Sequence, residues 1–195
     1  DYLIDSIQFS EQPASANALT AGMSEPGTPN PDSLNYSSGV LDTLGGGDTI
    51  TATSTGLQTT LANGGRIVGG SGVDTLKLAA GTTLDLTAIT NNQTVKSIQE
   101  VEVFEMQGTS TLTMSANDVL SLGGANATTM SAYSFSSGTL TSVGKVQFVV
   151  NGTATDTLNL RPLLSDGATG NTGLTGAWSM DGTVTIGGTS YKVYN

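Results

Sequence analysis

The most informative motif of the sequence is Gly69-Gly70-Ser71-Gly72-Val73-Asp74-Thr75-Leu76-Lys77. It follows the calcium-binding nonapeptide pattern G-G-x-G-x-D-x-U-x, in which U is a large apolar residue. The glycines permit a tight turn whose carbonyl oxygens face one point, and Asp74 adds an anionic oxygen of the kind that Ca²⁺ prefers. The last three residues then continue as a strand that directs Leu76 into a core. The pattern therefore predicts a calcium-binding turn followed by a buried strand.

A degenerate copy of this turn lies upstream at residues 44–50, Leu-Gly-Gly-Gly-Asp-Thr-Ile, with the same Asp-Thr-apolar exit. We expect Asp48 and Asp74 to bind Ca²⁺ through side-chain oxygens. The alternative is that both segments are glycine-rich turns with a solvated aspartate. The shared Gly-x-Asp-Thr-Ile/Leu pattern favours calcium. Backbone carbonyls would complete the shell of oxygen ligands, and we assign them to Gly46, Gly70 and Gly72.

The composition of the 195-residue chain excludes several functions. Asp and Glu outnumber Lys and Arg by 16 to 6, which gives a formal net charge of −10 and makes nucleic acid an improbable partner. The chain has no Cys and no His, so thiol nucleophiles, imidazole bases and the usual zinc ligands are absent. No apolar run reaches the roughly 18 residues of a membrane span. Because the chain begins at Asp1, we expect it to be a piece of a longer protein.

Short apolar alternations separated by Gly, Asn, Ser and Thr turns predict an all-β fold. We interpret the chain as a single domain, residues 1–195, with an opening strand and a long loop in residues 1–40 and the β core in residues 41–195. Short helical turns are expected within residues 54–62 and 115–122. Because fewer than three nonapeptides are present, we predict a β-sandwich with calcium-bound turns on its rim rather than a stacked β-roll. The expected strands are residues 2–9, 48–53, 66–68, 75–78, 83–86, 97–106, 109–114, 144–150, 156–160, 182–186 and 191–194.

The predicted strand at residues 97–106 carries an unusual pattern of charge. In a single strand Glu100 and Glu102 would share one face with the apolar Ile98 and Phe104. Carboxylates among large apolar groups are costly unless a cation meets them, and Ca²⁺ would serve. An edge strand with a solvated face is the alternative.

The order of the motifs resembles modules of giant type I-secreted RTX adhesins of bacteria. The paired glycine turns of residues 41–78 are similar to the family's calcium turns, and Val101-Glu102 with Thr111-Leu112-Thr113-Met114-Ser115 resembles its I-E-x-I…T-L-T-L-S stretch. Residues 150–160 fit V-x-G…G-D-x-V-x-L, and residues 178–194 are similar to the closing W…D-G-T-V-x-I-x-G-x-x-Y-x-V-Y segment. The resemblance covers residues 41–194, whereas residues 1–40 match no part of the family.

The resemblance implies an extracellular, Ca²⁺-dependent module of a bacterial cell-surface adhesin, flanked by further domains and acting in adhesion and biofilm formation. It is most similar to the family's peptide-binding domains, which hold the free C-terminus of a protein on a host or partner cell. It adds Glu102, which occupies the family's I-E position, to the expected calcium ligands. A salt bridge from Glu102 to Arg66 or Lys96 is the alternative. Weaker candidate ligands are Asp42, Asp118, Asp156 and Asp181, of which Asp118 is better explained as a helix cap and Asp181 as a turn residue.

Three other functions stay open at this point. One is a Ca²⁺-dependent carbohydrate-binding module, although only 5% of the residues are aromatic and Trp178 is the sole tryptophan available to stack on a sugar. Another is a Ca²⁺-rigidified structural or surface-layer domain. An enzyme is the least favoured, because acidic pairs such as Glu100 and Glu102 are its only candidate catalytic groups. The residues that would contact a ligand cannot be assigned from the sequence.

Overall fold

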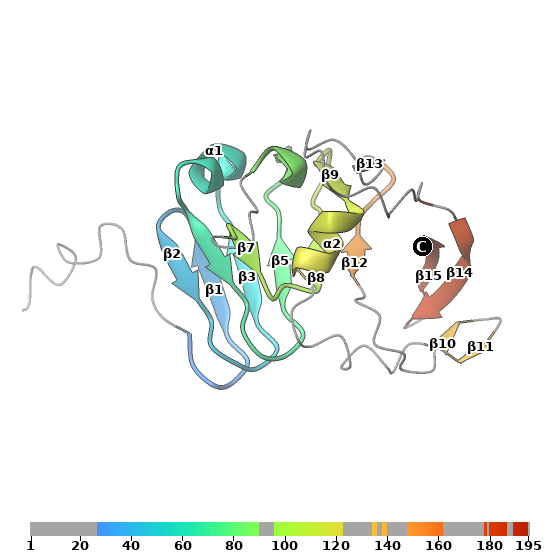
Figure 1. Cartoon of the computed structure of the whole chain (residues 1–195), viewed down its shortest axis with the longest axis horizontal. Coiled ribbons are helices and arrows are strands. Elements are labelled where there is room, and N and C mark those ends of the chain that lie inside the picture. The colour runs from blue at the N-terminus through green and yellow to red at the C-terminus, as the bar shows by residue number, and fades with distance from the viewer. Residues whose placement is uncertain are drawn as a thin grey trace, which may run out of the picture.

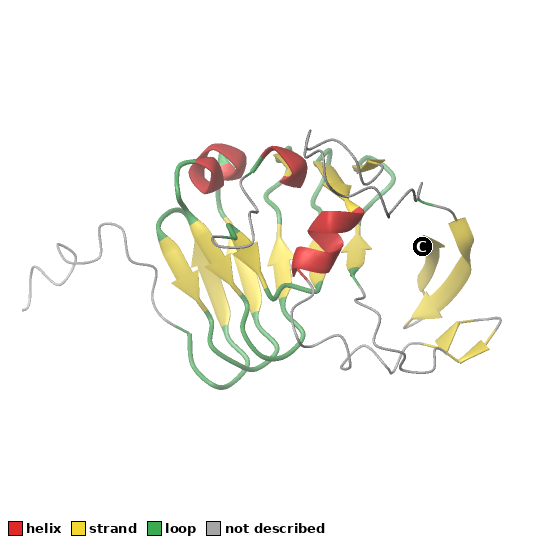
Figure 2. Ribbon diagram, viewed as in Figure 1, coloured by secondary structure: helices red, strands yellow, loops and turns green. Residues whose placement is uncertain are grey.

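The computed structural model describes residues 27–89, 96–122, 134–135, 138–139, 148–161, 178, 180–186 and 189–194. The opening strand predicted at residues 2–9 and the long loop that follows it lie outside these residues. The described part of the chain is built mainly from short strands (Figure 2).

Most strands belong to three parallel sheets through which the chain passes repeatedly (Figure 1). The largest sheet has the order β1 (Ser33–Tyr36), β3 (Thr49–Ala52), β5 (Thr75–Lys77), β8 (Val103–Glu105) and β12 (Val149–Asn151). A second sheet has the order β2 (Val40–Asp42), β4 (Arg66–Val68) and β7 (Ile98–Gln99). The third has the order β13 (Thr157–Arg161), β9 (Thr111–Ser115) and β6 (Thr83–Asp85).

Each strand pairs with its counterpart from the next turn of the chain. Ser33 lies opposite Thr49, Thr49 opposite Thr75, and Thr75 opposite Val103. Successive coils are therefore 16, 26 and 28 residues long, counted from 33 to 49, 49 to 75 and 75 to 103. Parallel pairing of equivalent positions in successive coils is the arrangement of a β-solenoid, in which each coil buries its apolar side chains against its neighbours.

The core consists of apolar side chains stacked in columns along the solenoid. In the largest sheet, Ile50, Leu76 and Phe104 occupy equivalent positions and are fully buried. Leu84 pairs with Leu112 in the third sheet, and Leu41, Ile67 and Ile98 follow one another in the second. Neighbouring strands lie about 4.8 Å apart, so each apolar residue covers the one before it.

The prediction of an all-β fold is confirmed, but the sheets do not have the arrangement expected for a β-sandwich. A sandwich of hairpins would pair its strands antiparallel, whereas the three sheets described above are parallel. The expectation rested on counting glycine nonapeptides. Stacking does not require one in every coil, because the parallel hydrogen bonds and the apolar columns continue through coils that lack the motif.

The stretch expected to form one strand at residues 97–106 is divided between two sheets. Strand β7 ends at Gln99 and β8 begins at Val103. Between them Glu100 has a φ of 52°, a left-handed conformation that ends the extended backbone. The prediction that Glu100 and Glu102 share one face of a strand is therefore wrong, because the chain turns a corner of the solenoid between them.

Short helices form where both helical turns were predicted (Figure 1). Helix α1 (Leu57–Ala62) buries Leu57 and Leu61, which are spaced one helical turn apart. Helix α2 (Ala116–Leu122) begins with the predicted capping arrangement, because the backbone N–H and hydroxyl of Ser115 both donate to Asp118 Oδ2 at 2.7 Å. A single 3₁₀ turn, η2, covers Leu86–Ala88.

A fourth sheet is antiparallel and shares no strand with the other three. Its order is β11 (Gly138–Thr139), β10 (Ser134–Phe135), β14 (Met180–Ile186) and β15 (Thr189–Tyr194). Strands β14 and β15 form the predicted C-terminal strand pair, with Val184 opposite Tyr191. Among the described residues, no helix is long and apolar enough to cross a membrane.

Candidate functional site: a column of buried carboxylates

The turns that precede the strands of the largest sheet stack on one another at one corner of the solenoid (Figure 2). They comprise residues 27–32, 43–48, 69–74 and 100–102. Each ends in an acidic residue one position before a strand: Asp32, Asp48, Asp74 and Glu102. Because the strands are in register, these four residues occupy equivalent positions in successive coils.

Backbone hydrogen bonds join these acidic residues into a ladder. The N–H of Asp48 donates to Asp74 Oδ1 at 2.8 Å, and the N–H of Asp74 donates to Glu102 Oε2 at 2.9 Å. The N–H of Asp32 donates in the same way to Asp48 Oδ1 at 2.8 Å. One oxygen of each of Asp48, Asp74 and Glu102 therefore holds the preceding coil in place. We call these three residues the carboxylate column.

The second oxygen of each carboxylate in the column has no partner. Asp48 Oδ2, Asp74 Oδ2 and Glu102 Oε1 are buried and accept no hydrogen bond. The three residues are only 1%, 0% and 1% exposed, so bulk water does not compensate. An unpaired buried carboxylate oxygen is strongly unfavourable unless the group is protonated or meets a cation.

Burial raises the pKa of Asp74 from 3.8 to about 7. Loss of solvation is the largest cause. The hydrogen bond from the N–H of Asp48 lowers the pKa, whereas the negative charges of Glu102, Asp48 and Glu100 raise it further. Burial also raises the pKa of Glu102. The negative charge of Glu100 raises this pKa further, whereas the hydrogen bond from the N–H of Asp74 lowers it. Near neutral pH, Asp74 is therefore partly protonated unless a positive ion lies beside it.

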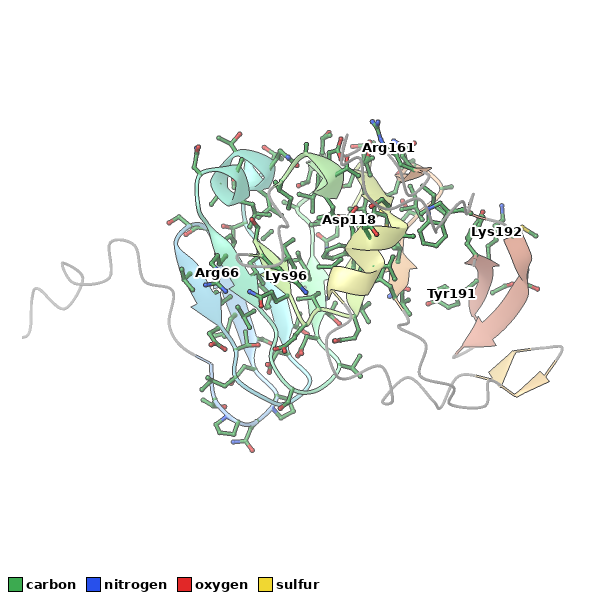
Figure 3. All side chains as sticks on the ribbon, viewed as in Figure 1. Arg66, Lys96, Asp118, Arg161, Tyr191 and Lys192 are labelled. Carbon is green, nitrogen blue, oxygen red and sulfur yellow. The ribbon has the colours of Figure 1, made fainter. Side chains whose placement is uncertain are left out.

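The alternative partner for Glu102 was a basic side chain, and the structure places the two candidates elsewhere. Figure 3 shows Arg66 and Lys96 close together, and Arg66 Nε donates to the carbonyl oxygen of Lys96 at 3.3 Å. Over the described residues, salt bridges join Lys77 to Glu105 and Arg161 to Asp85, and none reaches the carboxylate column.

The glycines of the two predicted turns bring these turns into contact. Gly46 donates its N–H to the carbonyl of Ser71 at 2.8 Å. A Cβ atom on Gly72 would overlap the carbonyl oxygen of Gly46, and its φ of +142° also disfavours a side chain. A Cβ atom on Gly70, which has a φ of +85°, would likewise overlap the carbonyl oxygen of Leu44. The predicted glycines thus stack the coils, and their role as carbonyl ligands stays a prediction.

Asp156, the remaining predicted ligand, lies in the third sheet's corner and does not join the carboxylate column. Its Oδ1 accepts the N–H of Ser110 at 2.8 Å, which repeats the ladder pattern. Its Oδ2 accepts both the N–H and the hydroxyl of Thr153, at 2.7 and 2.8 Å. These hydrogen bonds lower the pKa of Asp156. Both oxygens have partners, so this carboxylate needs no cation.

The other weaker candidates also lie outside the column. Asp42 Oδ1 accepts the N–H of Leu44 at 3.0 Å, and Asp118 caps helix α2. The side chain of Asp181 lies outside the described part of the structure. Asp32, by contrast, was missed. Its signal was the triplet Asp32-Ser33-Leu34, which repeats the Asp-Thr-apolar exit of both glycine turns.

The geometry of the column suits a hard divalent cation. Among the described residues no three acidic side chains gather around one point, so an ion would lie between two carboxylates and take further oxygens from the backbone. Ca²⁺ accepts roughly six to eight oxygens, backbone carbonyls among them, in a flexible arrangement. Mg²⁺ requires a near-ideal octahedron and usually keeps several waters, so it would fit a buried site of this kind less well.

Comparison of the chain with protein-family models, with curated proteins and with solved structures finds no match. The functional argument therefore rests on the geometry of these residues.

Proposed function

We propose that this chain is a calcium-stabilised β-solenoid module of an extracellular bacterial adhesin. The observation that supports it is the carboxylate column, with three unpartnered, buried oxygens on consecutive coils. In this proposal the orphaned oxygens of Asp48, Asp74 and Glu102 bind Ca²⁺, which neutralises their charge and fastens successive coils together. Because a β-solenoid has no covalent cross-links between coils and this chain has no Cys, such ions would replace disulfides outside the cell.

The burial of the column favours a rigidifying role for Ca²⁺ over direct contact with a ligand. A calcium ion that held the C-terminal carboxylate of a peptide would need an open coordination position facing solvent. Asp74 is 0% exposed, which leaves no route for a peptide to an ion bound beside it. We therefore propose that any adhesive contact, with a peptide or with a glycan, uses a different surface and depends on calcium only through the stability of the module.

The test is a titration of the calcium-depleted protein with CaCl₂ by calorimetry, together with thermal unfolding at each concentration. At a hundred times the dissociation constant, binding should stabilise the fold by about 2.7 kcal/mol. For a chain of this size that corresponds to a rise in Tm of roughly 5–10 °C. MgCl₂ at the same concentrations is the control and should give a smaller rise. Absence of both heat and any change in Tm would refute the proposal.

The adhesive part of the proposal has a separate test. Peptides with free and with amidated C-termini are compared for binding to the calcium-loaded module, with and without chelator. If calcium acts through stability alone, binding persists in chelator below the Tm of the calcium-free protein. Loss of binding at a temperature where the calcium-free protein is still folded would show instead that the ion contacts the ligand.

A further inference from the structure

A second row of equivalent positions runs beside the carboxylate column, at the start of each turn. Strands β2, β4 and β7 are paired in register, so the residues that directly follow them are equivalent in successive coils: Thr43, Gly69 and Glu100. We call these three residues the entry row. Thr43 lies five residues before Asp48, and Gly69 lies five residues before Asp74. Each of these two acidic residues therefore has a member of the entry row at the same place in its own turn.

Thr43 fills the space beside it with a side chain. Thr43 is 0% exposed, and its hydroxyl donates to the carbonyl oxygen of Gly69, the next member of the row, at 2.5 Å. At this level of the stack, a protein hydroxyl therefore satisfies the carbonyl of the following coil, and the methyl group of Thr43 occupies buried space.

Gly69 has no side chain with which to repeat this contact. A Cβ atom on Gly69 would overlap the carbonyl oxygen of Glu100, the next member of the row, and would lie 2.9 Å from Asp74 Oδ2. That oxygen of Asp74 is buried and accepts no hydrogen bond. A neutral oxygen and an anionic oxygen thus flank one point, each at 2.9 Å or less. A single Ca²⁺ ion, with bonds of roughly 2.3–2.6 Å, can contact both oxygens.

The charges around this point favour a cation. The carboxylate of Glu102 lies next to Asp74 in the ladder, with Oε2 at 2.9 Å from the N–H of Asp74. The negative charge of Glu100 acts on both of these carboxyl groups. Glu100 also holds a left-handed backbone, with a φ of 52°, which is costly for a residue with a side chain and is typical of functional sites.

We propose that the tightest Ca²⁺ ion of the carboxylate column binds Asp74 Oδ2 and the carbonyl oxygen of Glu100, at the position that Gly69 leaves without a side chain. Thr43 excludes an equally tight ion from the level of Asp48. The choice between glycine and threonine in the entry row thus determines which coil binds calcium most tightly. This inference rests on the proposed function, because it assigns a place to an ion that the column is proposed to bind.

The experiment counts the tightly bound Ca²⁺ ions of the full chain by calorimetry, with circular dichroism to establish that each variant is folded. We expect one tight ion in the wild type. Thr43→Gly should open an equivalent position beside Asp48 and raise the number to two. Thr43→Ser is the matched control, because it keeps both the Cβ atom and the hydroxyl, and it should bind one. Combining Thr43→Gly with Asp48→Asn should return the number to one, because the second ion needs the carboxylate of Asp48.

Gly69→Ala tests the same position in the opposite direction. Its Cβ atom would occupy the point between Asp74 Oδ2 and the carbonyl of Glu100, so calcium affinity should fall at least about tenfold, which corresponds to about 1.4 kcal/mol. If the overlap with that carbonyl prevents folding of Gly69→Ala, the Thr43 variants alone decide the question.

Three results would overturn the assignment while leaving calcium binding by the column intact. They are a second, equally tight ion in the wild type, an unchanged affinity in folded Gly69→Ala, and a single tight ion in Thr43→Gly. A wild type that binds no calcium at all would instead refute the proposed function itself.

Discussion

Replacing Asp74 with asparagine separates the charge of the carboxylate column from its shape. The amide oxygen of Asn can keep the hydrogen bond from the N–H of Asp48, which is now 2.8 Å from Asp74 Oδ1. The amide NH₂ takes the place of the orphaned Oδ2 and carries no charge. The substitution therefore removes one proposed calcium ligand and one buried carboxyl group that can ionise, and it changes the volume very little.

Without calcium we expect Asp74→Asn to stabilise the protein at pH 8. Burial raises the pKa of Asp74 from 3.8 to about 7, so its folded-state pKa lies above the unfolded one. The stability of the wild type is then fully present below pH 3.8 and falls as the pH rises through 7. At about 1.36 kcal/mol per pKa unit, the loss at pH 8 is roughly 4 kcal/mol. The buried amide NH₂ costs about 1–3 kcal/mol, which leaves a net gain of about 1–3 kcal/mol.

With saturating calcium we expect the stability advantage of the variant to shrink. The wild type gains about 2.7 kcal/mol at a hundred times its dissociation constant, which is comparable to that advantage. The variant has lost an anionic ligand between two coils, so it binds the ion more weakly and gains less. The assay is thermal unfolding at pH 8 of both proteins, in EDTA and in millimolar CaCl₂. Asp156→Asn is the matched control, since its carboxylate lies outside the column, and calcium should raise its Tm as much as that of the wild type.

A variant that is less stable than the wild type in EDTA, or that gains as much from calcium, would refute this reasoning. The first result would mean that the buried charge of Asp74 is compensated without a metal. The second would mean that calcium, if it binds, does so away from the carboxylate column.

Three further predictions follow from single residues. The raised pKa of Glu102 means that the calcium-free protein loses stability as the pH rises from the ordinary value of 4.5 through the raised pKa. Glu102→Gln should therefore flatten this loss, which urea unfolding at a series of pH values measures. Gly72→Ala should cost about 3 kcal/mol or more in the same assay, because its Cβ would overlap the carbonyl of Gly46. Gly64→Ala, at a φ of +94° in open space, is the control and should cost about 1 kcal/mol. Asp156→Ala should cost about 1–2 kcal/mol of unfolding free energy at neutral pH, and less in acid. The pKa of Asp156 is lowered in the folded protein, so the stability that its carboxylate contributes is lost as the pH falls through that pKa. Acid titration followed by circular dichroism measures this difference.

The sequence predicted individual elements better than their arrangement. The strands after both glycine turns and the capped helix α2 were predictable, because each depends on residues that are neighbours in sequence. The choice between a sandwich and a solenoid depends on which strands pair. Coils of 16, 26 and 28 residues show no fixed period, so the repeat that would have indicated parallel stacking was concealed.

The residues of the candidate site were also predictable one by one, whereas their arrangement was not. Asp48 and Asp74 were predictable from their turns, and Glu102 from its position relative to the family motif. That the three residues stack at one corner of the solenoid could not be predicted, because the turn before Glu102 is shorter than the others and contains a left-handed Glu100 rather than glycine. Strand β1 and Asp32 were missed because Pro31 and the preceding polar residues favoured a loop.

Asp74 and Asp156 show why an aspartate before a strand is not enough to indicate a metal. Both begin an Asp-Thr-Leu triplet, and both accept a backbone N–H of the preceding coil through one oxygen, at 2.8 Å from Asp48 and from Ser110 respectively. The difference lies in the turn before each residue. Thr153 supplies an N–H and a hydroxyl to the second oxygen of Asp156, whereas the glycine turn before Asp74 supplies no donor. A turn without side-chain donors leaves one carboxylate oxygen without a hydrogen bond, and this unpaired oxygen, repeated on three consecutive coils, is the observation on which the calcium proposal rests.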